Sequence, residues 1–498
     1  MRAEYIIVQA GGKGSRLGHL TANKPKALVP VDNLPMLFHL FRQFPHKRFI
    51  VIADHKKEVL REYLACFATV RYQVVDAPGT GTCGGLAQAL ALLPHHAPFM
   101  LVWSDLILPP ALAFPEAIGN LIGISESFPC RWRYQDGALE PQASTERGVA
   151  GLFLFRDKAC LAGVPQSGEF VQWLQTVGFR FDGEVGLAGT REFGLLADYE
   201  KLGQEKCRPF NRISTAGDVV TKEAVDEQGR ALALLEGQWY ETAQRLGVPA
   251  TPKIYGVQPL RMERIDGKNV YEYGGLPPGE KRAILRRLVA AVKDLHGRGH
   301  IAADAFSMKE AYYTKTMRRL HQVRDLIPLA DQRTITVNGR VCRNVFFHRR
   351  ALEQKLDALH CERFAFIHGD CTFSNLMLRG GEEPVFIDPR GYFGFTELYG
   401  DANYDWAKLY YSIVGNYDRF NLKDFRLQIG AHEARVDIQS NQWEALEGDF
   451  FALSGADPAT IRLLHAVIWL SLTTYAWQDY DSICGAFYNG LYYLEEVL

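Results

Sequence analysis

Residues 5–17 read Tyr5-Ile6-Ile7-Val8-Gln9-Ala10-Gly11-Gly12-Lys13-Gly14-Ser15-Arg16-Leu17, an apolar run that ends in a glycine-rich loop. Glycines after a strand let backbone N–H groups approach a phosphate closely, and a following helix adds the positive end of its dipole. The loop is not a P-loop, because its Gly-Lys pair is followed by glycine rather than by serine or threonine. We therefore predict a nucleotide-binding loop built from Gly11, Gly12, Lys13 and Gly14.

Short apolar runs and helical patterns alternate through the first two hundred residues. The strand-like runs cover 5–9, 48–53, 70–75 and 99–103, and the helical patterns cover 35–43, 56–66 and 84–93. Strands separated by helices at this spacing predict an α/β fold with a doubly wound, mostly parallel sheet. Ligands of such sheets bind at the carboxyl ends of the strands, so we expect the loops after the strands to carry the chemistry.

Three further loops suit phosphate chemistry. The turn Lys24-Pro25-Lys26 is stiffened by proline and presents Lys26 to a second phosphate group. A glycine-rich loop before the third helix makes Gly81 and Thr82 candidates for nucleotide binding. Asp105 follows an apolar strand. A lone aspartate there is usually a turn former or a helix cap, but beside two phosphate loops we predict a Mg²⁺ ligand.

These motifs, in this order, resemble the sugar-nucleotide and phosphocholine nucleotidyltransferase family over residues 1–200. That family has a G-G-x-G-[ST]-R loop, a downstream P-K pair, a G-T-x-x-G loop and a metal aspartate after an apolar strand. The resemblance implies that Arg16 binds the triphosphate, Lys26 the attacking phosphate and Asp105 the Mg²⁺. Glu192 stands where the family has its second metal aspartate. The longer side chain is a departure, and a surface glutamate is the alternative interpretation.

The reaction that these groups suit is nucleotidyl transfer. An oxygen of a phosphate monoester attacks the α-phosphorus of a nucleoside triphosphate, and pyrophosphate leaves. The attacking phosphate is already anionic at pH 7, so catalysis needs positioning and charge neutralisation rather than a general base. The nucleoside triphosphate stays open among CTP, UTP, GTP and dTTP.

The most specific stretch of the chain lies at 366–378 and reads F-I-H-G-D-C-T-F-S-N-L-M-L; V-F-I-D-P-R-G follows at 385–391. Kinase-type phosphoryl transfer uses an aspartate that orients the acceptor hydroxyl, an asparagine five residues later for metal, and a second aspartate for metal. Asp370, Asn375 and Asp388 fit these three roles. Isolated polar residues in loops are usually turn formers, but H-G-D-x-x-x-x-N with I-D at this distance favours the kinase interpretation.

The second half of the chain resembles the aminoglycoside-phosphotransferase and choline-kinase family over about 208–498. The resemblance implies an α+β bilobal kinase-like domain, with a small mixed lobe followed by a larger helical lobe. It also implies that Lys222 holds the ATP phosphates, that Glu236 orients Lys222, and that the backbone around Met262 meets adenine. Arg390 stands where many relatives carry tryptophan or an acid, and either a phosphate contact or a packing ion pair would explain it.

The alternating pattern of strands and helices ends near 203–209, and this change of pattern predicts two domains, 1–203 and 208–498. The local elements expected in the second are a turn at 214–217 between two strands, a helix at 231–246, and a hairpin at Asn338-Gly339. Aromatic residues late in the chain, such as Tyr411 and Tyr475, could form a cation–π cage for choline. Helix packing explains most of them more simply.

The 498 residues include 56 Lys+Arg and 57 Asp+Glu, a formal net charge of −1. This balance argues against a nucleic-acid partner. No secretory signal is evident and no apolar stretch is long enough to span a bilayer, so we expect no membrane partner and a cytoplasmic location. Nine cysteines without a C-x-x-C pair favour a reducing compartment. A homo-oligomer stays open.

Together the two halves predict a bifunctional transferase that uses Mg²⁺. The kinase half would phosphorylate a small alcohol or sugar with ATP, and the other half would couple that phosphate to an NMP, giving an activated precursor for cell-surface polysaccharide. The alternatives are a choline kinase joined to a CTP:phosphocholine cytidylyltransferase, a kinase that acts on an antibiotic, and one active domain with a nucleotide-binding regulatory module. A dinucleotide-dependent oxidoreductase in the first half is opposed by Arg16 and by Pro25-Lys26.

Overall fold

The computed structural model describes residues 3–77, 80–110, 112, 114, 119–200, 211–225 and 227–498. The chain divides into two compact units, residues 1–205 with 478–480 and residues 206–477 with 481–498. The described residues include eight cysteines, all of them free thiols. Within the same residues, no helix has both the length and the apolar character needed to cross a membrane.

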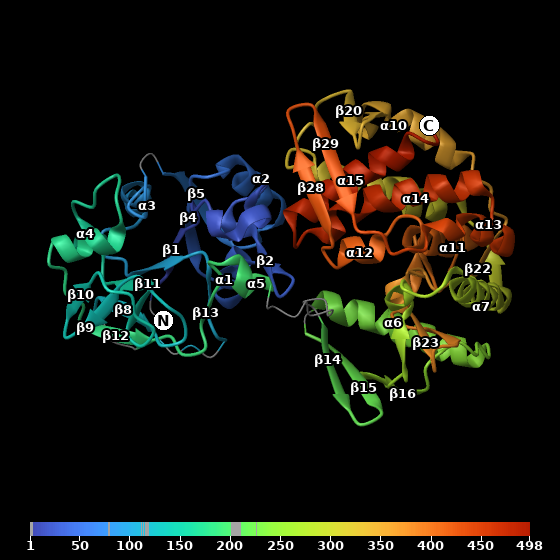
Figure 1. Ribbon diagram of the computed structural model, residues 1–498, viewed down its shortest axis with the longest axis horizontal. Helices are drawn as coiled ribbons and strands as arrows, with labels where there is room; N and C mark the ends of the chain where they lie inside the picture. The colour runs from blue at the N-terminus through green and yellow to red at the C-terminus, as the bar shows by residue number, and fades with distance from the viewer. Residues whose placement is uncertain are drawn as a thin grey trace. The chain divides into compact units, whose positions relative to one another are not determined.

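A nine-stranded sheet forms the centre of the first unit (Figure 1). Its parallel half has the order β5-β4-β1-β6, made of β1 (Tyr5–Gln9), β4 (Arg48–Ala53), β5 (Arg71–Asp76) and β6 (Phe99–Trp103). The rest of the sheet consists of β8 (Leu121–Ser125), β9 (Arg133–Gln135), β10 (Ala138–Glu140), β11 (Gly148–Phe155) and β12 (Gly183–Gly186). Strand β11 runs antiparallel to β6 and joins the two halves.

Helices cover both faces of this sheet, namely α1 (Met36–Gln43), α2 (Lys57–Phe67), α3 (Leu86–Ala91) and α4 (Phe170–Thr176). Successive residues of a strand point to opposite faces. On β4, Phe49 lies against Phe41 of α1 with ring centroids 4.7 Å apart. The next residue, Ile50, belongs to a core that includes Leu86 of α3 and Phe170 of α4. The doubly wound sheet expected from the sequence is therefore confirmed.

The order of the parallel strands marks the place where a ligand would bind. The chain starts at β1, adds β4 and β5 on one side, and then crosses to add β6 on the other. Such a switch point opens a crevice at the carboxyl ends of the two central strands. Gln9 ends β1 beside Trp103, which ends β6. The glycine-rich loop and Asp105 therefore leave the sheet side by side.

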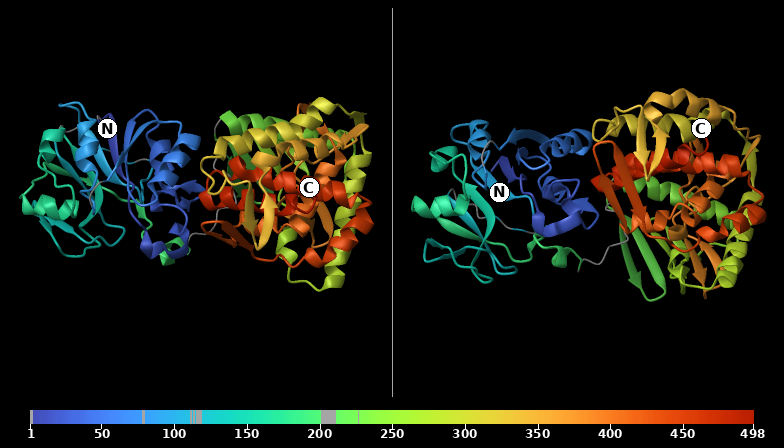
Figure 2. Two further views of the ribbon diagram at one scale, coloured as in Figure 1. Left: turned by 90° about the horizontal axis from the view of Figure 1, so that it is seen from above. Right: turned by 45° about the horizontal axis from the view of Figure 1, so that its top comes forward.

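The second unit begins with a four-stranded antiparallel sheet in the order β14-β15-β17-β16. Its elements are β14 (Asn211–Ala216), β15 (Val219–Ala224), α6 (Glu227–Arg245), β16 (Ile254–Val257) and β17 (Leu260–Glu263). The hairpin β14–β15, green in Figures 1 and 2, projects from this small lobe. The turn expected at 214–217 is wrong, because Ser214, Thr215 and Ala216 pair with β15. The chain turns at Gly217 and Asp218 instead, where Gly217 has a φ of +58°.

Helices dominate the rest of the second unit, as expected. They are α7 (Pro278–Gly297), α8 (Ala305–Lys309), α9 (Lys315–Val323), α10 (Val345–Asp357), α11 (Ala402–Ile413), α12 (Tyr417–Asn421), α13 (Glu447–Ser454), α14 (Pro458–Leu472) and α15 (Tyr480–Leu494). Two short sheets carry the loops around Asp370 and Asp388. One has the order β18 (Gly267–Asn269), β23 (Leu376–Arg379), β24 (Glu383–Phe386), and the other the order β19 (His300–Ala302), β22 (Arg363–Phe366), β27 (Tyr399–Gly400).

The hairpin at Asn338-Gly339 is confirmed. It joins β20 (Thr334–Val337) to β21 (Arg340–Arg343), with positive φ at both turn residues. A second hairpin, β28 (Phe425–Ile429) with β29 (Glu433–Ile438), pairs with β20 in a parallel sense. This second hairpin was not expected from the sequence, and its pairing to β20 joins residues about a hundred positions apart.

Candidate active sites

The glycine-rich loop of the first unit is closely packed on its inner side and open on its outer side. Gly14 has a φ of +64°, and a Cβ there would lie 2.9 Å from Cγ2 of Thr21 and 3.0 Å from Cβ of Lys26. A Cβ on Gly11 would lie 2.8 Å from Cβ of Asp54. Gly12 has no atom within 4 Å of such a position. The loop thus leaves its backbone open to a ligand at Gly12, as a phosphate cradle requires.

Three predicted residues of the first unit lie together at the switch point. Lys26 is buried and forms an ion pair with Asp105, and its Nζ lies 3.7 Å from Oε1 of Glu192. Glu192 reaches this place because β13 (Arg191–Glu192) pairs with β7 (Leu106–Ile107), directly after Asp105. Burial raises the pKa of Glu192, and Asp105 adds to the rise while Lys26 and Arg16 oppose it.

The two carboxylates fit a divalent cation. Oδ1 of Asp105 is buried and accepts no hydrogen bond, so it offers an unused ligand atom. The described residues contain no group of three or more His, Cys, Asp or Glu side chains arranged around a metal. Mg²⁺ commonly takes only one or two protein carboxylates and fills its shell with waters and substrate phosphates. The pair Asp105 and Glu192 is the kind of site that Mg²⁺ uses with a nucleotide.

Arg16 joins this cluster, whereas Lys13 and Thr82 have other surroundings. A Cβ on Gly194 would lie 3.2 Å from Nη2 of Arg16, beside the Glu192 carboxylate. Lys13 is exposed on the outer part of the loop. The hydroxyl of Thr82 donates to Glu169 and accepts from a backbone N–H, which ties its loop to the segment before α4. Gly81 is packed against the same segment, with a φ of +80°. Nucleotide binding by this loop stays a prediction.

The second unit brings Lys222, Glu236 and Asp388 together from three elements. Nζ of Lys222 on β15 lies 2.7 Å from Oε2 of Glu236 on α6 and 2.6 Å from Oδ1 of Asp388, after β24. Trp239 fixes α6 to the loop after β22, because its Nε1 donates to the Ile367 carbonyl at 2.8 Å. Asp388 has a φ of +54°, a conformation that is uncommon for residues other than glycine and is often found at functional sites.

The proximity of these groups shifts the pKa values of Lys222 and Glu236. Burial alone would lower the pKa of Lys222, but Asp388 and Glu236 outweigh it and raise that pKa, so Lys222 stays charged. Burial raises the pKa of Glu236 to about 7 against the opposing charge of Lys222, and Asp388 adds to the rise. Two carboxylates therefore share one ammonium group, and Glu236 holds a proton more readily than an exposed glutamate does.

The Asp370 loop is held by a buried carboxylate on α11. Asp405 accepts hydrogen bonds from the backbone N–H groups of His368 and Gly369, at 2.8 and 2.7 Å. Asn375 donates to the carbonyl of Asp370 at 2.9 Å and accepts from the N–H of Ile387, next to Asp388. These contacts place the three predicted phosphoryl-transfer residues on adjoining loops. Met262 lies inside β17 between β15 and β16, and its adenine role stays a prediction.

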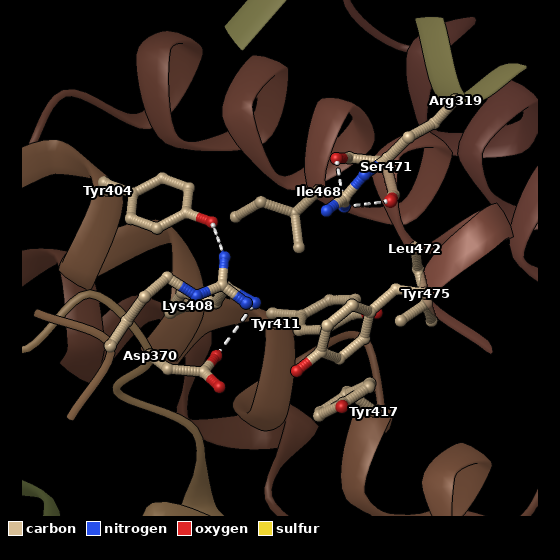
Figure 3. Close-up of a pocket in the computed structure, with 11 residues that line it drawn as sticks. Arg319, Asp370, Tyr404, Lys408, Tyr411, Tyr417, Ile468, Ser471, Leu472 and Tyr475 are labelled. Carbon is tan, nitrogen blue, oxygen red and sulfur yellow. Dashed lines mark hydrogen bonds and ion pairs between the residues drawn. The ribbon is translucent and has the colours of Figure 1, made fainter. Parts of the chain in front are cut away.

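A pocket opens beside Asp370, and the sequence analysis missed most of its lining (Figure 3). Lys408, on α11, pairs with Asp370 at 2.9 Å. Arg319, on α9, donates to the carbonyl and hydroxyl of Ser471 on α14. One local signal was available: Asp405 and Lys408 are three positions apart, which sets both on one side of a helix. The approach of α9 and α14 to this helix has no short-range signal.

The comparisons with known proteins agree with this division. The family described as the MobA-like NTP transferase domain matches residues 6–141, and the phosphotransferase enzyme family matches residues 210–437. Both families consist of transferases. The chain therefore carries a nucleotidyltransferase domain of the MobA-like family followed by a domain of the phosphotransferase enzyme family.

Relatives of the first domain include sugar-phosphate nucleotidyltransferases. The UTP–glucose-1-phosphate uridylyltransferase AglF of Haloferax volcanii is 35% identical over 109 residues, which cover 20% of this chain and 42% of that protein. The N-acetylmuramate alpha-1-phosphate uridylyltransferase of Neisseria meningitidis serogroup B is 28% identical over 162 residues, 29% of this chain and 68% of that protein. The solved CTP:phosphocholine cytidylyltransferase of Streptococcus pneumoniae is 20% identical, with a TM-score of 0.33 over 40% of this chain and 97% of that one.

Proposed function

We propose that the chain catalyses two consecutive phosphate transfers. The second unit phosphorylates a hydroxyl group of a small molecule with ATP. The first unit then joins the resulting phosphate monoester to the nucleotidyl group of an NTP and releases pyrophosphate. The product is a nucleoside-diphosphate-activated building block, for which we propose a role in cell-surface polysaccharide synthesis in the cytoplasm. The presence of both transferase families on one chain carries this proposal.

In the kinase step, the acceptor oxygen bonds to the γ-phosphorus of ATP, the bond to the β,γ-bridging oxygen breaks, and ADP leaves. Asp370 orients the acceptor hydroxyl and receives its proton. Lys222, held by Glu236 at 2.7 Å, binds phosphate oxygens of ATP. The backbone around Met262 meets adenine. Asn375 and Asp388 are the residues that would hold Mg²⁺ in this unit.

In the transferase step, a monoester oxygen bonds to the α-phosphorus of the NTP, and the bond to the β-phosphate oxygen breaks. Lys26 binds the attacking phosphate and Arg16 the triphosphate. Gly11, Gly12, Lys13 and Gly14, with Gly81 and Thr82, surround the nucleotide. Asp105 and Glu192 would hold Mg²⁺ here. When bound in either unit, Mg²⁺ supplies neutralisation of phosphate charge.

The acceptor of the first unit is proposed to be a sugar phosphate. The names of its relatives support this choice, since they include nucleotidyltransferases for phosphates of glucose, mannose and N-acetylmuramate. The matched segments cover only 20–29% of this chain in these three comparisons, so the sugar is left to experiment.

A pair of isosteric variants tests the division of labour. Asp370→Asn should abolish ATP-dependent phosphorylation yet leave pyrophosphate release intact when a phosphorylated substrate is supplied. Asp105→Asn should do the reverse, with a loss of about 10²–10³-fold in the transferase rate, on the scale of removing one positioned electrostatic group. Products are followed by mass spectrometry with a panel of sugars, aminoalcohols and NTPs.

The outcome that contradicts the proposal is equally specific. If either folded variant silences both half-reactions, the two sites do not act independently. If only one half-reaction is ever detected in the wild type, the other unit is a nucleotide-binding module rather than an enzyme. Unchanged thermal unfolding of each variant is the control for folding.

A further inference from the structure

The pocket beside Asp370 contains many more positive than negative charges. Three basic side chains line it, Arg319, Arg390 and Lys408, and Asp370 is the single acidic residue among the described residues that line it. Lys315, one helical turn before Arg319 on α9, lies at its edge with Nζ 5.8 Å from the ring centre of Tyr404. Three cations therefore share the pocket with one carboxylate, and Lys315 lies beside them.

Most of these cations have neutral partners only. Lys408 is paired with Asp370. Arg319 donates to the carbonyl and hydroxyl of Ser471, as Figure 3 shows, and Arg390 donates to the hydroxyl of Tyr404 at 3.3 Å. Within the described residues, no carboxylate lies within ion-pair distance of Lys315, Arg319 or Arg390. The lining thus carries an excess of two positive charges, from Arg319, Arg390 and Lys408 against Asp370.

The pKa of Lys315 is affected by the same excess of positive charge. Burial lowers the pKa of Lys315 well below its ordinary value, and the nearby charges of Arg390, Arg319 and Lys408 lower it further, against a weaker effect of Glu310. The preceding turn, Glu310–Thr314, is a π-helix, a form that is rare and frequent at functional sites. Uncompensated buried cations are costly unless a ligand neutralises them.

The tyrosines of the pocket are already occupied by these cations. Nζ of Lys408 lies 5.4 Å from the ring centre of Tyr411 and 6.0 Å from that of Tyr417. The guanidinium carbons of Arg319 and Arg390 each lie 5.7 Å from the ring centre of Tyr475. An aromatic cage binds a quaternary ammonium group through free ring faces. Here the protein's own cations lie near these rings, and a choline-like acceptor would add a further positive charge to a pocket that already has an excess of them.

We propose that this pocket binds an acceptor molecule that carries both a hydroxyl group and an anionic group, and that it rejects cationic acceptors. The acceptor is a sugar or polyol whose anionic group is either a carboxylate or a phosphate ester. Arg319 and Arg390 bind the anionic group, since a guanidinium offers paired donors to carboxylate and phosphate oxygens. The anion thereby sets the hydroxyl against Asp370. This inference rests on the proposed kinase function and names the substrate class of that site.

Inorganic phosphate is the probe that tests the pocket without a known acceptor. The full chain, saturated with Mg²⁺ and a non-hydrolysable ATP analogue, is titrated calorimetrically with phosphate and with choline at equal ionic strength. We expect phosphate to bind, and Arg319→Met to weaken that binding at least tenfold. Arg319→Lys should recover part of it. Arg324→Met removes an exposed arginine just beyond the same helix and should change nothing.

Competition then identifies the anion. Glycerate and glycerol 3-phosphate share a three-carbon skeleton with glycerol and differ from it in their anionic group, so glycerol is the uncharged control. If glycerate displaces phosphate at the lower concentration the pocket is one for carboxylates, and if glycerol 3-phosphate does so it is one for phosphate esters. Binding of choline to the wild type, or phosphate affinity that is equal in wild type and Arg319→Met, would overturn the inference. Arg319→Met must still bind the ATP analogue, which shows that the lobe is folded.

The two proposals fail in different ways. If the wild type binds no ATP analogue in the second unit, the kinase function is wrong whatever phosphate does. If the analogue binds and Arg319→Met weakens it as much as it weakens phosphate, the cations serve the ATP phosphates. In that case the kinase function stands and the anionic acceptor is wrong.

Discussion

Lys222 holds two carboxylates, Glu236 and Asp388, and this sharing gives the kinase site its electrostatic character. Of these two carboxylates, Glu236 is buried, whereas the side chain of Asp388 is about half exposed. Burial is the main cause that raises the pKa of Glu236 to about 7, and the nearby charge of Asp388 adds to the rise against the effect of Lys222. The ordinary pKa of glutamate is 4.5. The site therefore couples protonation to folding within the range of ordinary buffers.

The sign of this coupling leads to a stability prediction. Below pH 4.5 Glu236 is protonated in both folded and unfolded chains, so its favourable contribution is fully present. As the pH rises to about 7 the unfolded chain releases the proton first, and the free energy of unfolding falls. Glu236→Gln should remove this fall, a difference of up to about 3 kcal/mol between the two proteins.

Thermal unfolding from pH 4.5 to pH 7 measures the difference. Glu241→Gln, on the exposed side of the same helix, is the matched control and should follow the wild type. Parallel pH curves for wild type and Glu236→Gln would mean that folding does not shift the pKa of Glu236, which would contradict this prediction.

Strand β11 shows how one element positions the transferase site. Its pairing with β8 is interrupted between Val149 and Phe153, and Gly151 within this irregular stretch has a φ of +85°. A Cβ on Gly151 would overlap the ring of Trp103 at the end of β6. The bent strand leaves room for that ring, and Trp103 comes two residues before Asp105. The irregularity of β11 thus supports the position of Asp105.

Two glycine variants separate backbone conformation from overlap. Gly163 has a φ of +84°, almost the same as Gly151, but no atom lies within 4 Å of its Cβ position. Gly163→Ala should cost about 1–2 kcal/mol, the penalty for a positive φ. Gly151→Ala should cost roughly 1–3 kcal/mol more and lower transferase activity. Urea unfolding and pyrophosphate release measure both effects, and equal costs would contradict the role given to the bend.

At the scale of the whole molecule, the two units have separate cores and separate candidate sites. We expect two unfolding transitions, one stabilised by ATP with Mg²⁺ and the other by the NTP of the transferase. At a hundred times the dissociation constant, a ligand adds about 2.7 kcal/mol, which corresponds to a shift of roughly 5–10 °C.

Calorimetry of the full chain with each NTP measures these shifts. Lys222→Met should remove the ATP shift and leave the other one unchanged. A single transition that moves as one with every nucleotide would show that the units unfold together and would contradict this prediction.

Much of this architecture is encoded in local patterns. Alternating strands and helices predict the doubly wound sheet, and the spacing within the Asp370 loop predicts kinase chemistry, because both depend on residues close together in the chain. The turn at 214–217 was wrong because strand pairing with β15 outweighs the turn preference of Ser214 and Gly217. Glu192 could be compared only with a family pattern, and its place beside Lys26 comes from the pairing of β13 with β7.

The charge of the pocket beside Asp370, by contrast, is decided by the tertiary structure and not by local sequence patterns. Arg319, Arg390 and Lys408 are scattered over ninety positions, and each one alone is an ordinary basic residue. They form one cluster of positive charge because the packing of α9, α11 and α14 brings them into one pocket with Asp370. Short-range sequence therefore specified the reactions, since motifs follow the chain. Long-range packing specified the charge around Asp370, and with it the acceptor that we propose for the kinase site, since the electrostatic potential of a pocket depends on charges that are neighbours only in space.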